Sequence, residues 1–304
     1  MRAAAVEGGP RVLQGVICGV SAYLLWGVFP LYFRAVRAAG ALEILSHRIV
    51  WSAALLGVLV LLRRQGRAAV EELRARPWAL LATAGLISGN WLLYVWAVNS
   101  NRVLESSLGY FINPLVNVVL GALVLGERLS RRQVAAVALA AAGVLVLVAK
   151  GGVVPWVALG LAASFSLYAL VRKTAGIDPF RGLFIETALA APAALGWLLW
   201  KTATGGTAFV AGGWSLRLLL LSAGPVTAVP LVCFGHAARH LRLSTVGLLQ
   251  YISPTGQFVL AVAIFGERFT LPHAVTFGLI WAALAIYCAD ALVGARRAAA
   301  SAPA

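Results

Sequence analysis

The sequence predicts an all-α integral membrane protein of about ten transmembrane helices, arranged as two inverted five-helix repeats. Three observations predict this fold class. Of the 304 residues, 61% are hydrophobic and only 12% are charged, which is about half the charged share of a soluble domain. Apolar runs long enough to cross a hydrocarbon core of about 30 Å recur along the chain. Finally, a motif of the first half returns in the second.

The predicted spans are the apolar runs between charged or Gly/Pro-rich breaks. They lie near 12–33, 44–62, 78–98, 103–125, 134–149, 153–171, 183–200, 216–234, 244–265 and 272–292. The longest polar stretches, Arg63–Pro77 and Lys201–Ser215, are too short to form a domain of their own. We therefore expect the lipid bilayer to be the main environment, and function to be built from the helices and their connections.

The positive charges predict the orientation. A net charge of +15 would suggest a nucleic-acid partner in a soluble protein, but in a membrane protein Lys and Arg mostly record which loops are cytoplasmic. Most of these residues fall in segments on the side of the N-terminus, and Arg48 lies within a span. We expect no nucleic acid as a partner, and both termini in the cytoplasm.

The repeated motif predicts the inversion. Ile112, Pro114 and the run 126–128 (GER) recur at matching positions as Ile252, Pro254 and the run 266–268. Two repeats, 12–149 and 153–292, follow from this match. Because each has five spans, the two enter the bilayer from opposite sides. Transporters use such pairs to build an outward-facing and an inward-facing state from one fold, whereas the alternative is duplication for packing alone.

The repeated prolines predict a substrate cavity at mid-membrane. Each proline removes a helical donor and leaves a carbonyl without its usual partner, that of Tyr110 for Pro114, so we expect matched kinks. Broken backbone at that depth is tolerated only against protein or a water-filled cavity, and kinks buried for packing are the alternative. The polar candidates around the prolines are Asn113, Asn117, Gln250 and Ser253.

Further candidates lie in three other spans. Asn90 and Trp91 lie far enough from a span end to hold a ligand by hydrogen bonding and stacking rather than to anchor the interface. His47 and Arg48 lie just inside the outer end of one span and Glu186 just inside the inner end of another, at nearly equivalent repeat positions. Ionisable residues in membrane spans usually face the bundle interior or a cavity, so each group is a candidate gate. Snorkelling to the headgroups is the alternative.

Two hypotheses concern partners. If transport is coupled to a proton, Glu186 is the best titratable candidate. The GxxxG patterns Gly15–Gly19 and Gly85–Gly89 permit close helix approach, either within the bundle or in a homodimer.

Catalytic and cofactor chemistry is not expected. The three cysteines are isolated, and His236 and His240 are four residues apart without a third metal ligand. There is no phosphate-binding GxxxxGK[ST] loop, and no buried nucleophile with a base or paired carboxylates at credible spacing. We predict no enzyme, no metal and no cofactor.

Several runs resemble the RarD-type members of the EamA family, in the drug/metabolite transporter superfamily. They are SHRIVWS (46–52), GNWLLYVWAVN (89–99), ESSLGYFINPLVNVVLGALVLGER (105–128) and LRLSTVGLLQYISPT (241–255). The resemblance implies a ten-helix inverted-repeat bundle in the bacterial plasma (inner) membrane that exports or exchanges small organic solutes or drugs. We therefore expect a secondary transporter of small molecules. The alternatives are a passive channel or facilitator, and a non-transporting receptor or assembly factor.

Overall fold

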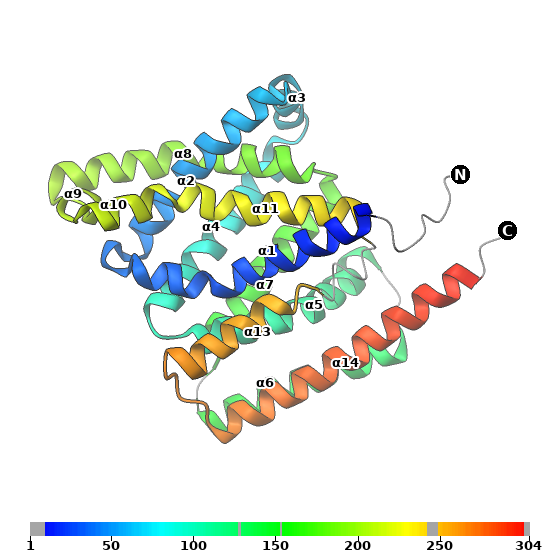
Figure 1. The fold of residues 1–304 in the computed structure, drawn as a ribbon. Coiled ribbons are helices and arrows are strands. Elements are labelled where there is room, and N and C mark those ends of the chain that lie inside the picture. Colours follow the sequence, from blue (N-terminus) through cyan, green and yellow to red (C-terminus); the bar gives the residue numbers. More distant parts are fainter. Residues whose placement is uncertain (1–9, 127–128, 153, 242–248, 301–304) are drawn as a thin grey trace.

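The computed structural model describes residues 10–126, 129–152, 154–241 and 249–300, and among these residues it contains helices and no strands (Figure 1). The helices of the first half are α1 (Pro10–Ala35), α2 (Gly40–Leu62), α4 (Pro77–Asn99), α5 (Val103–Leu125) and α6 (Arg131–Gly151), joined in part by η1 (Arg37–Ala39) and α3 (Gly66–Ala75). Those of the second half are α7 (Trp156–Ala175), α8 (Pro179–Thr204), α9 (Ala208–Ala211), α10 (Trp214–Leu221), α11 (Ala223–His240), α13 (Ile252–Val259), η2 (Leu260–Ile264) and α14 (Leu271–Ala300).

Eight helical segments of the described residues are long and apolar enough to cross a membrane. The two other predicted spans correspond to α7, whose last turn carries Arg172 and Lys173, and to the shorter pair α13–η2. Residues 244–248 of the predicted ninth span lie outside the described residues. The predicted all-α membrane fold is confirmed.

The contacts between the two halves come in matched pairs. Helix α1 packs on α11 as α7 packs on α4, α1 packs on α13 as α7 packs on α5, and α2 packs on α11 as α8 packs on α4. Equivalent helices also pack on each other, as α2 on α8, α5 on α13 and α6 on α14. In Figure 1, α6 and α14 form a pair along one side of the bundle. Helices at matching positions of the two predicted repeats therefore pack on matching partners.

Glu267 shows the relative direction of α5 and the pair α13–η2 at one end of the bundle. Glu267, which follows η2, accepts hydrogen bonds of 2.8 Å from the backbone amides of Val103 and Leu104 at the start of α5. The end of α13–η2 therefore lies against the beginning of α5, and the two run antiparallel. We call this end of the bundle the Glu267 end. Burial raises the pKa of the Glu267 carboxyl above its ordinary value, and the two amide hydrogen bonds act against that rise.

The opposite end of the bundle is tied by Glu72 of α3. Its carboxylate accepts a hydrogen bond of 2.7 Å from the amide of Asp178 and pairs at 2.8 Å with Arg181, both at the start of α8. We call this the Glu72 end. The first turn of α1 and the last turns of α14 lie on the same side of the view as this end, whereas α9 and α10 lie on the other (Figure 1).

The two repeated prolines differ in structure. Helix α5 continues through Pro114 without interruption. Pro254 instead lies in the first turn of α13, directly after a turn at residues 250–251, where a missing N–H removes no helical hydrogen bond. One proline therefore lies inside a helix and the other in the first turn of one, and matched kinks at the two positions stay a prediction.

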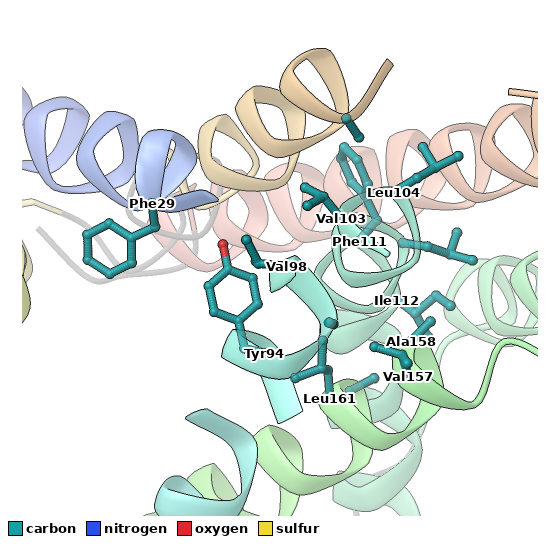
Figure 2. Close-up of a cluster of buried hydrophobic side chains, with 14 of the residues drawn as sticks. Phe29, Tyr94, Val98, Val103, Leu104, Phe111, Ile112, Val157, Ala158 and Leu161 are labelled. Atoms are coloured by element: carbon teal, nitrogen blue, oxygen red, sulfur yellow. The ribbon is translucent and has the colours of Figure 1, made fainter. Parts of the chain in front are cut away.

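The core lies where α4, α5 and α7 meet, and Phe111, Ile112 and Leu161 pack there (Figure 2). Gly109 lets the α5 backbone approach α7 closely, because an added Cβ would lie 2.7 Å from the carbonyl oxygen of Ala158. This close approach fixes the register of α5 against α7, and with it the positions of the polar side chains that follow on α5.

Candidate functional site

The guanidinium of Arg48 is buried between helices of both halves. Arg48 lies on the buried face of α2, one turn from Ile44 and Ser52, and is only 6% exposed. Its Nε donates a hydrogen bond of 2.9 Å to Thr227 Oγ1 of α11. The side chain therefore does not reach the headgroups, and the snorkelling alternative does not apply to it.

Aromatic rings surround this cation. The Trp91 ring of α4 lies with its centroid 4.1 Å from the guanidinium carbon, and the rings of Phe29 and Phe33 of α1 lie at 5.9 and 5.7 Å. Such contacts contribute about 2 kcal/mol when desolvated, whereas burying a charge costs several kcal/mol even after relaxation. The rings therefore offset only part of the cost of burying this charge.

Two tyrosines complete the site. Tyr94 of α4 meets Phe33 edge-on at 5.8 Å and Tyr110 of α5 at 5.7 Å between centroids. Both lie within electrostatic range of Arg48, as does Tyr32 of α1. Figure 2 shows Tyr94 extending from α4 toward the helix that carries Phe29. We call Arg48, Phe29, Phe33, Trp91, Tyr94, Tyr110 and Thr227 the Arg48 cluster.

His47 neighbours this cluster on α2. Its Nδ1 accepts a hydrogen bond of 3.1 Å from Trp51 Nε1, and its ring packs at 4.9 Å against that of Phe209. The Nε2 atom is buried and has no hydrogen-bond partner in the described part of the chain. The bond to Trp51 and the contact with Phe209 fix the orientation of the imidazole ring, and Nε2 is left available for a hydrogen bond.

Glu186 of α8 forms a separate polar group toward the Glu72 end. Its Oε2 accepts a hydrogen bond of 3.1 Å from the Tyr168 hydroxyl and lies 3.5 Å from Arg172 Nη1. Arg172 also donates to the Tyr168 hydroxyl and, at 2.9 Å each, to the carbonyls of Asp178 and Pro179. The carboxylate side chain is fully buried, so this is an interior ion pair between α7 and α8.

The predicted amides bind helices together. Asn90 donates to the Leu161 carbonyl at 3.1 Å and to Ser164 Oγ at 2.9 Å, both on α7. Asn113 likewise donates to the Ala162 carbonyl at 3.2 Å and to Ser166 Oγ at 2.9 Å.

Asn117 and Ser253 bond to neighbours on their own helices, whereas Gln250 lies outside a helix. Asn117 donates to the Asn113 side chain at 3.3 Å. Ser253 accepts from Gln257 at 3.2 Å, and Gln250 is half-buried in the turn before α13. The structure thus brings Trp91 and Tyr110 to Arg48, and directs Asn90 and Asn113 toward α7.

A cavity of about 500 Å³ opens at the Glu267 end. Charged residues line it, among them Arg102, Glu105, Glu267 and Arg268. No member of the Arg48 cluster is among its lining residues. It is therefore an opening at the mouth of the bundle, separate from the buried cation.

Comparisons with known proteins place the chain in a family. Residues 13–149 match the EamA-like transporter family. An uncharacterized transporter of Vibrio cholerae is 49% identical over 92% of this chain and 93% of its own, and Protein RarD of Escherichia coli is 47% identical over 93% and 97%. The chain belongs to the RarD group of EamA-like transporters. It is thus a multi-pass membrane transporter of the drug/metabolite superfamily.

A solved crystal structure shares the fold of this EamA-like transporter. The TM-score is 0.59 at 21% identity, with 90% of this chain and 96% of that chain covered.

Sequence reasoning missed several members of the site of this transporter. Phe29 and Phe33 carry no signal, because an apolar residue in an apolar span looks the same whichever way it faces. Thr227 carries little, because a threonine hydroxyl can also bond to the backbone of its own helix. Tyr168 and Arg172 could have been found, since they stand one turn apart on α7 and face the start of the helix that carries Glu186.

Proposed function

We propose that this EamA-like transporter is a secondary transporter that exports or exchanges small organic solutes or drugs across the bacterial plasma (inner) membrane by alternating access. The matched contacts between the halves carry the proposal. If the halves 12–149 and 153–292 are equivalent, exchanging their conformations converts an outward-facing state into an inward-facing one around the same site.

The Arg48 cluster is the proposed substrate site. It joins α1, α2, α4 and α5 of the first half to α11 of the second through the bond between Arg48 and Thr227. A change in the packing of the halves alters the surroundings of this cation directly. Glu186, near the other end of the antiparallel pair α2–α8, is the proposed inner gate residue and the proposed carrier of a coupling proton.

The orientation and the oligomer are also proposals. The Lys and Arg excess in the loops on the side of the N-terminus supports cytoplasmic termini. Gly85 and Gly89 of α4 support a homodimer, because a Cβ added at either glycine would meet no atom within 4 Å in this chain.

The test compares the small molecules released by cells that express the wild type, Glu186→Gln or the control Glu71→Gln at equal membrane abundance. Glu71 is exposed and paired with Arg67, so its variant should behave as the wild type. A compound released by the wild type and the control, but not by Glu186→Gln, supports both export and the role of Glu186. Release by all three contradicts the role of Glu186, and no difference between expressing and non-expressing cells contradicts export.

A further inference from the structure

The charge of Arg48 has no counter-charge in the described structure. An arginine side chain carries its charge at neutral pH. No ion pair joins Arg48 to a carboxylate of the described residues. Its Nη1 atom is buried and lacks a hydrogen-bond partner, although Nε is bonded to Thr227. A buried cation in this condition is incomplete without an anion.

The described carboxylates are all engaged elsewhere. Four of them accept hydrogen bonds from backbone amides at the starts of helices: Glu43 at α9, Glu105 at α7, Asp178 at α8 and Glu267 at α5. The others pair with arginines away from the cluster: Glu71 with Arg67, Glu72 with Arg181, Glu186 with Arg172, and Asp290 with Arg132. No carboxylate of the described residues is therefore left to balance the charge of Arg48, and a bound anion would supply that counter-charge.

The side chains around Arg48 indicate the chemical class of that anion. The rings of Trp91, Phe29 and Phe33 face the guanidinium and offer apolar contact. The Tyr94 hydroxyl is buried and lacks a partner within the described residues, so a second donor accompanies Arg48 Nη1. A guanidinium fork with a hydroxyl suits the planar carboxylate group.

The net charge of the ligand follows from the charged residues just described. A single arginine balances one negative charge, which disfavours a phosphate dianion. The ammonium of a zwitterion would need a carboxylate near the cluster, and the described ones are occupied. The surroundings therefore favour a monoanion over a zwitterion or a neutral solute.

We infer that the Arg48 cluster binds an organic monoanion, a carboxylate attached to an aromatic or similarly apolar body. This inference rests on the proposed function, because it names the substrate class of the same site. Arg48 would hold the carboxylate, Tyr94 would donate to it, and Trp91 would stack on the body.

The test measures ligand binding to the purified full-length protein by thermal unfolding and calorimetry. The probes are phenylacetate and indole-3-acetate, the neutral phenylacetamide and indole-3-acetamide, and zwitterionic phenylalanine. The acids should raise the unfolding midpoint in proportion to their occupancy. The amides and phenylalanine should not, because they lack either the charge or a partner for the ammonium.

The variants separate binding from structure. Arg48→Gln should weaken binding of the acids by about 10- to 100-fold, the range expected for a lost charge-assisted hydrogen bond. The affinity of Arg48→Lys for the acids should fall between those of the wild type and Arg48→Gln, since lysine keeps the charge but not the planar fork. This variant replaces Arg48→Gln in the test if the glutamine variant does not fold. The control Arg63→Gln removes a guanidinium stacked at 4.7 Å on Phe180 at the exposed end of α2, and should bind as the wild type.

Three results would overturn the inference: no midpoint shift by either acid, equal shifts by acid and amide, or full affinity in Arg48→Gln and Arg48→Lys. These outcomes are distinct from failure of the proposed function. Transport of a neutral solute without acid binding would overturn the ligand class alone. Binding of the acids that depends on Arg48, without any carrier-mediated flux, would overturn transport and leave the ligand class standing.

Discussion

The buried pair between Glu186 and Arg172 should show unequal costs when either partner is removed. Breaking a buried ion pair typically costs about 3–5 kcal/mol, because the remaining charge is left without compensation. In Glu186→Ala, Arg172 keeps its 2.9 Å bonds to the carbonyls of Asp178 and Pro179, and its side chain is 15% exposed. The free energy of unfolding should therefore fall by about 2–3 kcal/mol. In Arg172→Ala, the fully buried Glu186 keeps the hydroxyls of Tyr168 and Thr83 but no cation, so the free energy of unfolding should fall by about 3–5 kcal/mol.

The assay is a double-mutant cycle on the free energy of unfolding, measured by SDS titration in mixed micelles. The double variant should cost little more than Arg172→Ala alone, which gives a coupling energy of about 2 kcal/mol. The exposed pair Arg67–Glu71 is the control, and its coupling should be about 0.5 kcal/mol or less. Additive effects at Glu186 and Arg172, or a larger cost for Glu186→Ala, would refute the reasoning.

Four further substitutions, one of them the control Gly85→Ala, test the packing of the helices around the site. Gly109→Ala should destabilise by about 1–3 kcal/mol because its Cβ would lie 2.7 Å from a carbonyl oxygen of α7, whereas Gly85→Ala, with open space, should be neutral or stabilising by up to about 1 kcal/mol; SDS unfolding measures both. Asn113→Ala should cost about 1–2 kcal/mol in the same assay, since it leaves α7 groups without their donor. Glu267→Ala should cost about 1–2 kcal/mol and accelerate hydrogen exchange at the start of α5, because two amides lose their acceptor.

Each of these predictions has its own contradicting result. Equal midpoints for Gly109→Ala and Gly85→Ala would mean that α5 and α7 do not approach as described. An Asn113→Ala variant as stable as the wild type would show that its amide is not needed between the helices. Unchanged exchange at Val103 and Leu104 in Glu267→Ala would exclude the described cap.

The sequence supports prediction of the membrane spans because hydropathy depends on local composition alone. The helical fold, the position of each apolar segment and the return of the motif around Pro254 could all be read without tertiary information. The different surroundings of Pro114 and Pro254 could not. Whether a proline lies within a helix or begins one depends on the turn at residues 250–251, which carries no strong breaker of its own.

The site could be predicted only where a residue is unusual for its surroundings. Arg48 and Glu186 stand out as charges inside apolar spans, and the structure finds both buried. Their partners do not stand out: Phe33 is one of many apolar residues, and Arg172 reads as a loop charge that records orientation. That Asn90 bonds to α7 depends on the register between two helices distant in sequence, which no local pattern contains.

Counterflow in proteoliposomes tests most directly whether the two halves form an alternating-access carrier. Vesicles containing the purified protein are loaded with an excess of an unlabelled compound that expressing cells release, and labelled compound is added outside. A carrier predicts that label accumulates transiently inside above its equilibrium level, because each outward passage of unlabelled compound returns the site for label. Label that only approaches equilibrium, at a rate independent of the internal pool, would contradict alternating access and indicate a passive channel.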